Sequence, residues 1–350
     1  METRTLKYSP EGPFLGSLKQ AVETYFKRKG LSPYADFQLH AKGIILFGSW
    51  ILCYLYIMLE NSTPGMTMLL CCALGVLSSF VNFNIMHDAS HGAYSKDDRI
   101  NTWLARTLNL VGGSDFMWKT KHVVLHHTFV NTEHDEDIET GGLLRMSPRQ
   151  PWKPRHKYQH LYALILYSLL AIQWIYVNDY KKYFTQEIHG KKIRMKDADK
   201  YVFWITKILH LLLFVFIPYL IFGWIFIFGW LVYFMTVGVV ISVVFQLAHV
   251  HEHACFTETT SGKIPTSWAE QQVLETMDFG VDSPLLTWFL GGLNFQTVHH
   301  LFPRVSHTHY PTLQKIVAGK CREFSLSYTE VTFWYALKSH FRHLRNLGKK

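Results

Sequence analysis

Histidine is the residue type whose spacing in this sequence most clearly indicates chemistry. The candidate ligands form three groups: His87 and His91; His122, His126 and His127; and His299 and His300, preceded by Gln296. Histidines four residues apart share one face of a helix, and neutral imidazole nitrogens are ligands for iron, zinc or copper. Each group lies beside a stretch long and apolar enough to enter a bilayer. The sequence therefore predicts a metal site built by several segments that meet at a membrane face.

A further candidate, His249, ends the last long apolar stretch in the run Gln246-Leu-Ala-His249. With it the sequence offers eight histidines and Gln296, which is more than one metal ion binds. We therefore expect two metal ions held mainly by imidazole. Two such ions at a membrane face favour a redox centre that activates dioxygen, although zinc remains open on ligand type alone.

Four apolar stretches have the length of roughly 20 residues that crosses a hydrocarbon core of ~30 Å. They run approximately over 43–59, 66–86, 202–222 and 224–248. A fifth stretch, 161–177, is shorter and contains Gln173. If all histidine groups share one site, an even number of crossings separates His127 from Gln296, so we expect this fifth stretch to lie in the membrane interface. The stretch 99–111 has a similar amphipathic pattern, and a core helix of a cytosolic cap is the alternative for both.

The predicted fold is an all-α integral membrane protein. We expect four transmembrane helices in two hairpins, interfacial helices, and a cytosolic cap that holds a di-metal site. The expected parts are a cytosolic N-terminal segment at 1–42, a membrane domain at 43–333 and a basic C-terminal tail at 334–350. Lys and Arg are frequent in the N-terminal segment and absent from the connections at 60–65 and 218–223. The positive-inside rule therefore places both termini and the active site in the cytosol.

Composition supports a membrane setting. Hydrophobic residues make up 49% of the chain and charged residues 17%, with a formal net charge of +9. A basic surface suits anionic lipid headgroups, phosphate-bearing substrates or an acidic redox partner. The basic residues form no compact module interleaved with aromatics, so we expect no nucleic-acid partner. The five cysteines have no metal-ligand spacing and indicate a reduced compartment.

With these residues the sequence resembles the membrane fatty-acid desaturase family, whose hallmark is three histidine boxes around a di-iron centre. The resemblance runs from the first apolar stretch to Pro311. Gln296 replaces the first histidine of the third box and His-His-Leu-Phe-Pro303 follows, which is similar to the front-end (delta-5/delta-6-like) subgroup. His249 matches the extra histidine of the family, whereas Phe245 stands where better-studied animal members have Asn.

The resemblance implies an oxygen-dependent desaturase with two iron ions that introduces a cis double bond into a long, already unsaturated acyl chain. The substrate would be an acyl-CoA or an acyl-lipid. The sequence contains no His-Pro-Gly-Gly haem signature, so we expect a separate electron donor, a ferredoxin or a cytochrome with its NAD(P)H reductase. The expected location is a bacterial inner membrane, or otherwise the endoplasmic reticulum.

Other polar residues near the boxes are candidates for supporting roles. Asp88 and Asn294 could hydrogen-bond the outer nitrogens of ligating histidines. The acidic run 135–139 could do the same, but we expect a solvated loop there. His251 and His253 flank His249, and we expect them outside the set of ligands.

Two other classes of function remain as alternatives. A membrane di-iron hydroxylase would use the same ligands to insert oxygen. A histidine-rich metal transporter would place its ligands near the bilayer midplane, whereas the boxes lie at the ends of apolar stretches whose centres we expect to be nearly free of ionisable groups. A haem carrier needs only one pair of facing histidines.

Overall fold

The computed structural model describes residues 6–256 and 262–349, and this part of the chain is mainly helical. The first five residues of the expected N-terminal segment and Lys350 of the expected tail lie outside it. The chain divides into two compact units. Residues 37–120 and 164–243 form the first, here called the membrane unit, and residues 1–36, 121–163 and 244–350 belong to the second, here called the histidine-rich unit.

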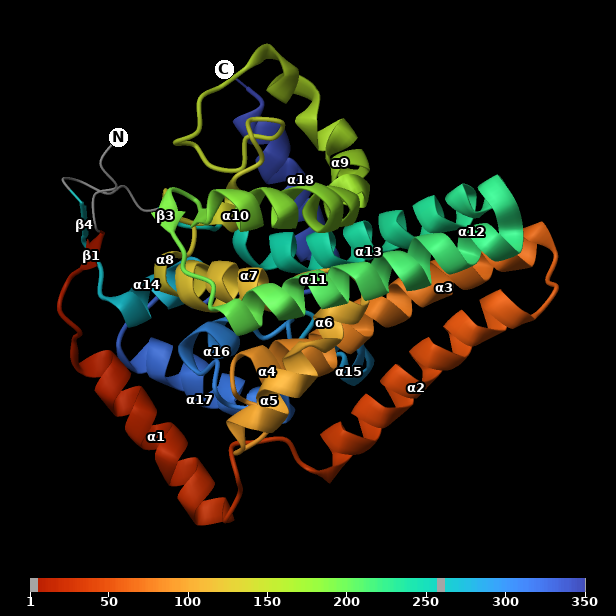
Figure 1. The fold of residues 1–350 in the computed structure, drawn as a ribbon. Coiled ribbons are helices and arrows are strands. Elements are labelled where there is room, and N and C mark those ends of the chain that lie inside the picture. Colours follow the sequence, from red (N-terminus) through yellow and green to blue (C-terminus); the bar gives the residue numbers. More distant parts are fainter. Residues whose placement is uncertain (1–5, 257–261, 350) are drawn as a thin grey trace. The chain divides into compact units, whose positions relative to one another are not determined.

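Helices build the membrane unit, with one small hairpin of two strands (Figure 1). Its elements are α2 (Phe37–Leu59), α3 (Pro64–Val81), α4 (His87–Ser90), α5 (Asp98–Ala105), α6 (Thr107–Leu110), α7 (Asp115–Trp118), most of α9 (Gln159–Gln173), α10 (Asp179–Thr185), the antiparallel pair β2 (Glu187–Ile188) and β3 (Lys191–Lys192), α11 (Asp197–Leu211), α12 (Ile217–Phe222) and most of α13 (Phe226–His249). The expected helix at 99–111 is divided between α5 and α6.

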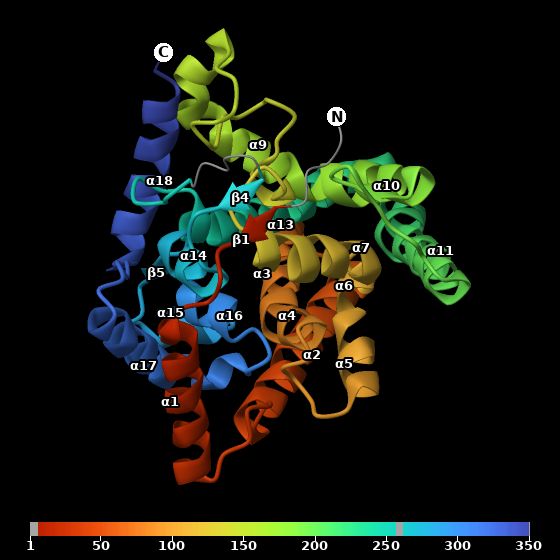
Figure 2. The same cartoon turned by 90° about the vertical axis from the view of Figure 1, so that its left-hand side faces the viewer.

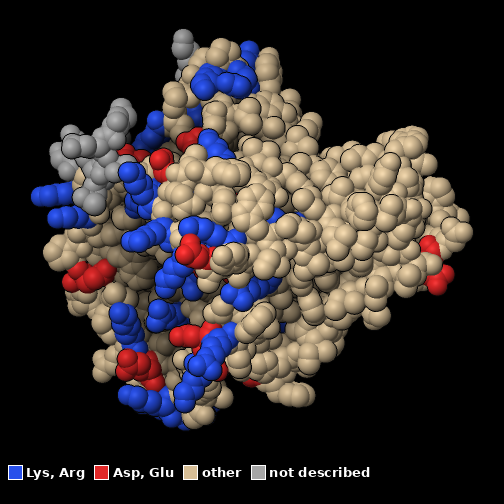
Figure 3. All heavy atoms as spheres, in the orientation of Figure 1, with Lys and Arg blue, Asp and Glu red and all other residues tan. Residues whose placement is uncertain are grey.

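Two long hairpins dominate the membrane unit (Figure 1). The first joins α2 to α3, where the Thr63 side chain caps the new helix by accepting a hydrogen bond from the Met66 backbone N–H. In the second, Gly223 adopts φ 61° and ψ −152° between α12 and α13, a backbone conformation that glycine reaches without steric cost. In Figure 3 the surface over the hairpin tips is almost free of Lys and Arg. The expected all-α membrane fold is confirmed.

Four helical stretches are long and apolar enough to cross a membrane: Phe37–Leu59, Pro64–Ser90, Pro154–Thr185 and Asp197–His249. The last of these is the hairpin that reverses at Gly223. The stretch Pro154–Thr185 is 32 residues long and contains the helix that the sequence placed in the interface, so it is longer than the apolar pattern indicated. The interfacial position of 161–177 stays a prediction.

A buried ion pair inside the membrane unit was not foreseen. The Lys207 ammonium, on α11, lies 2.9 Å from the Asp179 carboxylate and donates to the backbone oxygens of Gly112 and Ile175 at 2.6 and 2.9 Å. His210, one turn further along α11, hydrogen-bonds the Tyr176 hydroxyl at 2.8 Å. The expectation of few ionisable groups concerns the centres of the spans. Lys207 lies near the start of the expected span 202–222 and His210 near its centre, so the second hairpin carries ionisable groups that were not expected, and the ion pair joins three segments.

The histidine-rich unit packs short helices around a common core. Its elements are β1 (Lys7–Tyr8), α1 (Pro13–Lys29), α8 (His127–Phe129), 3₁₀-helices Glu136–Ile138, Pro154–Tyr158 and His307–His309, β4 (Lys263–Ile264), α14 (Trp268–Leu274), β5 (Asp278–Phe279), α15 (Pro284–Leu290), α16 (Gln296–Leu301), α17 (Tyr310–Glu323), β6 (Glu330–Val331) and α18 (Phe333–Leu347). The strands form two parallel pairs, β1 with β4 and β5 with β6.

Helices from distant parts of the sequence share the core of this unit. Phe14 and Leu18 of α1 are buried with Val273 of α14, Val298 of α16 and Leu313 of α17, and Figure 2 shows the four helices grouped together. Helix α1 of the expected N-terminal segment 1–42 therefore packs into this core, and α2 begins at residue 37; the expected division of the chain stays a prediction. The helix that carries the third histidine box lies at the centre of this packing.

Candidate metal centre

Helix α16 presents the third box from a completely buried position. All six of its residues are buried. The Asp278 carboxylate accepts a hydrogen bond from the Thr297 backbone N–H at 2.8 Å, and the Thr276 and Thr297 hydroxyls are 2.9 Å apart. Before the helix, Gly292 has φ 71°, and a Cβ there would lie 2.7 Å from the Cβ of His307. The chain therefore reaches α16 through a turn that accepts only glycine.

Three buried histidines from three segments converge within the histidine-rich unit. One ring nitrogen from each of His126, His249 and His300 lies within 4.8 Å of the other two. His126 ends the π-helical stretch Lys119–His126, His249 ends α13 and His300 belongs to α16. The three side chains are at most 4% exposed, so a metal ion held by them would be shielded from water.

Each of these three rings is held from its Nδ1 side. The Nδ1 atoms of His126, His249 and His300 lie 3.0 Å from an Asp135 carboxylate oxygen, 3.2 Å from the Glu275 backbone oxygen and 2.8 Å from the Gln272 side-chain oxygen. A carbonyl oxygen only accepts hydrogen bonds, so Nδ1 of His249 and His300 carries the proton and Nε2 keeps its lone pair.

The opposite nitrogens fit a metal. The Nε2 atoms of His126 and His249 are buried and have no hydrogen-bond partner among the described residues. A buried polar atom without a partner is costly, and a metal ion would satisfy it. Nδ1 bound to protein with Nε2 turned inward is the arrangement found around metal-ligating histidines.

The remaining histidines of the second and third boxes lie beside this trio. The ring centroids of His127 lie 4.6 Å from His299 and 4.3 Å from His300, and His122 lies 6.1 Å from His299. Nδ1 of His299 is 3.2 Å from the Tyr310 hydroxyl. The two boxes therefore contribute five of their histidines, all buried, to one cluster with His249.

The first box lies in the membrane unit. His87 and His91 lie one turn apart at α4, with ring centroids 4.8 Å apart, and both are buried. The Trp118 ring packs edge-on against both, at 5.7 and 6.3 Å. Asp88, beside them, is buried as well, and its supporting role stays a prediction.

The acidic run after the second box is not a solvated loop. Asp135 is buried, and one oxygen of Asp137 lies 3.4 Å from Nδ1 of His126 and 3.7 Å from Nδ1 of His122. Burial would raise the pKa of Asp135, but His126 lowers it below the ordinary value. Burial likewise opposes charge on His126, yet Asp135 raises its pKa. The signal missed in the sequence was the short distance, nine residues, from His126 to Asp135.

The pKa of His122 shifts in the opposite direction to that of His126, because no carboxylate lies as close to its ring. Removal from water lowers the pKa of His122 to about 4, even though Asp137 is within reach. His122 is therefore neutral at physiological pH, which is the state that binds metal. The Phe245 ring packs edge-on against the His122 ring, with centroids 5.6 Å apart.

Two amide residues of the third box region have different surroundings. The Gln296 side chain donates to the Leu293 backbone oxygen at 2.7 Å, and its buried Oε1 has no partner among the described residues. Asn294 donates to the Thr287 hydroxyl at 3.1 Å, so the structure places it against α15 and not against a histidine ring. Its supporting role beside a ligand stays a prediction.

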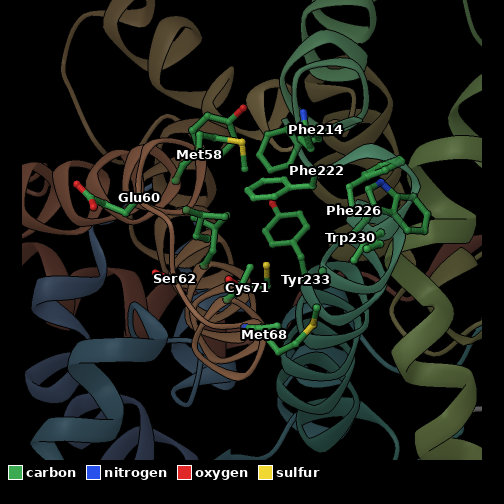
Figure 4. Close-up of a pocket in the computed structure, with 18 of the residues that line it drawn as sticks. Met58, Glu60, Ser62, Met68, Cys71, Phe214, Phe222, Phe226, Trp230 and Tyr233 are labelled. Atoms are coloured by element: carbon green, nitrogen blue, oxygen red, sulfur yellow. The ribbon is translucent and has the colours of Figure 1, made fainter. Parts of the chain in front are cut away.

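A separate apolar pocket lies within the membrane unit. It has a volume of about 200 Å³, and its lining includes Met58, Cys71, Phe214 and Tyr233 from both hairpins (Figure 4). None of the candidate ligands lines it. The pocket is therefore not part of the candidate metal centre.

Comparison with known proteins identifies the family. The profile of the fatty acid desaturase family matches residues 64–332. The sn-1 linoleoyl-lipid 6-desaturase of Arthrospira platensis is 34% identical over 342 residues, covering 96% of this chain and 92% of its own. The acyl-lipid (8-3)-desaturase of Physcomitrium patens is 34% identical over 339 residues, covering 95% and 71%. The corresponding 6-desaturase of Synechocystis sp. is 33% identical over 361 residues, covering 98% of both chains.

The chain belongs to the fatty acid desaturase family. It is an oxidoreductase of lipid metabolism and a membrane protein. Within the family its relatives are desaturases of the front-end type, and the resemblance predicted from the third box is confirmed.

Proposed function

We propose that this desaturase introduces a cis double bond into an unsaturated acyl chain carried on a membrane lipid. The relatives named as acyl-lipid desaturases support a lipid-borne substrate. A linoleoyl chain, named for two of them, is the first substrate to test. Acyl-CoA is the alternative carrier.

The proposed ligands of two iron ions are the nine residues predicted from the sequence: His87, His91, His122, His126, His127, His249, Gln296, His299 and His300. The single observation that carries this proposal is the His126, His249 and His300 group, whose members are held by Nδ1 and converge in a buried place. The first box supports it by a buried pair one turn apart. For Gln296, the unpartnered Oε1 is the atom available to a metal.

When bound, iron would activate dioxygen, which is the oxidant, so that an unactivated C–H bond can be broken. The overall balance is one acyl chain, one dioxygen, two electrons and two protons in, and one unsaturated chain and two waters out. Two C–H bonds break on neighbouring carbons and one C=C bond forms. The residues of this chain hold the ions, fix the ring orientations and exclude water.

We also propose that the active site and both termini face the cytosol and that a separate ferredoxin or cytochrome supplies electrons. The absence of Lys and Arg from the connections of both hairpins supports this orientation. A bacterial inner membrane is the proposed location, and the relatives from Arthrospira platensis and Synechocystis sp., which match over 92% and 98% of their own length, support it.

The test is the fatty-acid profile of host membranes that express the wild type, His300→Ala or His40→Ala, with linoleate supplied. His40 is exposed and serves as the matched histidine control. We expect a new, more unsaturated acid with the wild type and His40→Ala, and none with His300→Ala. A hydroxylated chain without a new double bond would establish the hydroxylase alternative instead.

A further inference from the structure

The outer face of α18 carries a stripe of basic residues with an aromatic at one end. Trp334, Lys338, Arg342, Arg345 and Lys349 recur at helical spacing, and all five are exposed. The sequence contains no Asp or Glu from residue 331 to the end. Glu252 pairs with Arg342 at 3.0 Å. Lys338 and Arg345 have no ion-pair partner among the described residues.

A second basic segment continues this surface. The loop before α9 packs on the end of α18, because the Arg145 guanidinium donates to the Leu347 backbone oxygen at 3.0 Å and the Trp152 indole donates to the Gly348 oxygen at 2.8 Å. Residues 145–158 also lack Asp and Glu. Figure 3 shows Lys and Arg gathered over this loop. We call α18 and the adjoining 3₁₀-helix Pro154–Tyr158 the basic face.

The inner side of the same helix contacts the segment that follows a candidate iron ligand. His340 of α18 donates from Nδ1 to the backbone oxygen of Val250 at 2.7 Å, and Val250 directly follows His249. Two residues further, the Glu252 backbone N–H donates to the Ser339 hydroxyl at 3.2 Å. Val250 is buried, and a helix with its side chains is about 10–12 Å across, so on this side the thickness of α18 lies between Val250 and the outer face of the helix.

We propose that the basic face is the docking surface for the acidic one-electron carrier protein that supplies the desaturase. The inference rests on the proposed function, which consumes two electrons in each turnover. Two reduced carriers each deliver one electron through α18 towards His249 and leave oxidised. The charge of the face favours an anionic partner. Helix α18 itself carries no acidic residue, and Glu252 neutralises only Arg342, so the remaining positive charge attracts an anionic protein and steers its approach. The exposed Trp334 supplies the aromatic contact that protein interfaces favour.

The contact with the ligand-bearing segment favours a carrier protein over anionic lipid. A basic stripe that only binds lipid headgroups could lie at any membrane-facing place on the protein surface. An electron carrier must instead dock where the path to the metal is short, and α18 combines both features. Anionic lipid is therefore an outcome of the experiment and not the proposal.

The experiment uses the full-length, iron-loaded enzyme in nanodiscs. The variant Lys338→Glu/Arg345→Glu reverses two charges of the basic face. The control variant Lys19→Glu/Lys315→Glu makes the same charge change at exposed positions of α1 and α17. The probes are a reduced acidic plant-type ferredoxin and a reduced acidic cytochrome b5 haem domain. Three quantities are measured: the Kd of each probe, the KM and kcat with each probe as electron donor at two salt concentrations, and the product of a single turnover driven by dithionite.

We expect the variant to raise Kd and KM for at least one probe tenfold or more, to flatten their salt dependence, and to leave kcat and the dithionite-driven turnover within twofold. The control should match the wild type. Unchanged Kd and KM for both probes would overturn the proposal. If the variant instead loses as much activity with dithionite as with the carriers, and the loss depends on the anionic lipid content of the nanodisc, the basic face binds lipid. Tight probe binding without any product would leave the docking surface standing and reject the proposed desaturation.

Discussion

At the scale of single residues, the orientation of an imidazole is decided by the group that holds its outer nitrogen. His300 donates from Nδ1 to the Gln272 side chain and His249 to a backbone oxygen. His126 instead faces the Asp135 carboxylate, the one negatively charged partner of the three. Such a carboxylate increases the basicity of the ring and strengthens the bond to a metal. All three rings are therefore held at Nδ1, but the Nε2 atom of His126 is expected to be the strongest electron donor to a metal.

This difference makes Asp135 testable. Asp135→Asn keeps the size of the side chain and removes its charge, so we expect iron affinity to fall by roughly 10- to 100-fold. Titration of the metal-free protein with Fe(II) or Co(II) measures the change. Asp282→Asn, at an exposed position, is the control and should leave the affinity unchanged. Equal affinity in the two variants would contradict a role for Asp135 in holding His126.

The same scale shows what sequence could provide. The spacing of the boxes identified the histidines, because ligands that share a helix turn recur at fixed intervals. The partners of the outer nitrogens have no such rule. Gln272 and Glu275 lie more than twenty residues from the rings they hold, and only the packing of α14 against α16 and against the end of α13 brings them there.

At the scale of elements, α16 is held by a carboxyl group that titrates near neutrality. Asp278 of β5 accepts hydrogen bonds from the Thr297 backbone N–H at 2.8 Å and the Tyr328 hydroxyl at 2.5 Å. Its complete burial raises the pKa of Asp278 to about 7, although both hydrogen bonds act in the opposite direction. The short strand pair β5 and β6 thus sets the position of the third box.

The raised pKa predicts how stability depends on pH. An unfolded aspartate ionises near pH 4, so between about pH 4 and 7 the folded state retains a proton that the unfolded chain has lost. The stability contributed by this group is complete below pH 4 and is lost as the pH rises towards 7. Asp278→Asn cannot titrate. We expect the wild type to lose about 1–3 kcal/mol more than the variant between pH 5 and 8.

Chemical unfolding of the detergent-solubilised protein at both pH values measures this difference. Asp282→Asn again serves as control and should follow the wild type. A constant gap in stability between Asp278→Asn and the wild type at all pH values would show that Asp278 ionises normally.

Elements were predicted with unequal success for a physical reason. Long apolar stretches are visible because the bilayer demands length and hydrophobicity, so the two hairpins agree with the sequence. The pair of Lys207 and Asp179 could not be predicted from the sequence. A lysine in an apolar stretch indicates the end of a span unless its partner is known, and here the partner is 28 residues away. The short helices and strands around the boxes have too few residues for any periodicity to appear.

At the scale of the whole molecule, the metal would tie together segments that are far apart in the chain. The His126, His249 and His300 group joins residues separated by up to 174 positions (300 − 126). A ligand that binds only the folded state stabilises it in proportion to its concentration. Metal and fold are therefore linked, and loss of metal should weaken the histidine-rich unit.

We expect the melting temperature of the metal-free enzyme to rise with added Co(II), by the equivalent of about 2.7 kcal/mol at a hundredfold excess over Kd. The variant His126→Ala/His300→Ala should show little or no rise, and chelation should return the loaded wild type to the metal-free value. Differential scanning fluorimetry measures all three. An equal rise in the double variant would place the metal elsewhere.

The division of the chain into units has a consequence for engineering. Each unit is assembled from separated stretches, since residues 37–120 and 164–243 form one and the stretches before, between and after them form the other. A hybrid with a relative that is joined at a single point between residues 37 and 243 would build at least one unit from parts of both parents. Recombination that aims to transfer regioselectivity should therefore exchange 37–120 and 164–243 together, as a double insert; His87 and His91 then come from the donor, while the other seven proposed ligands stay in the parental unit.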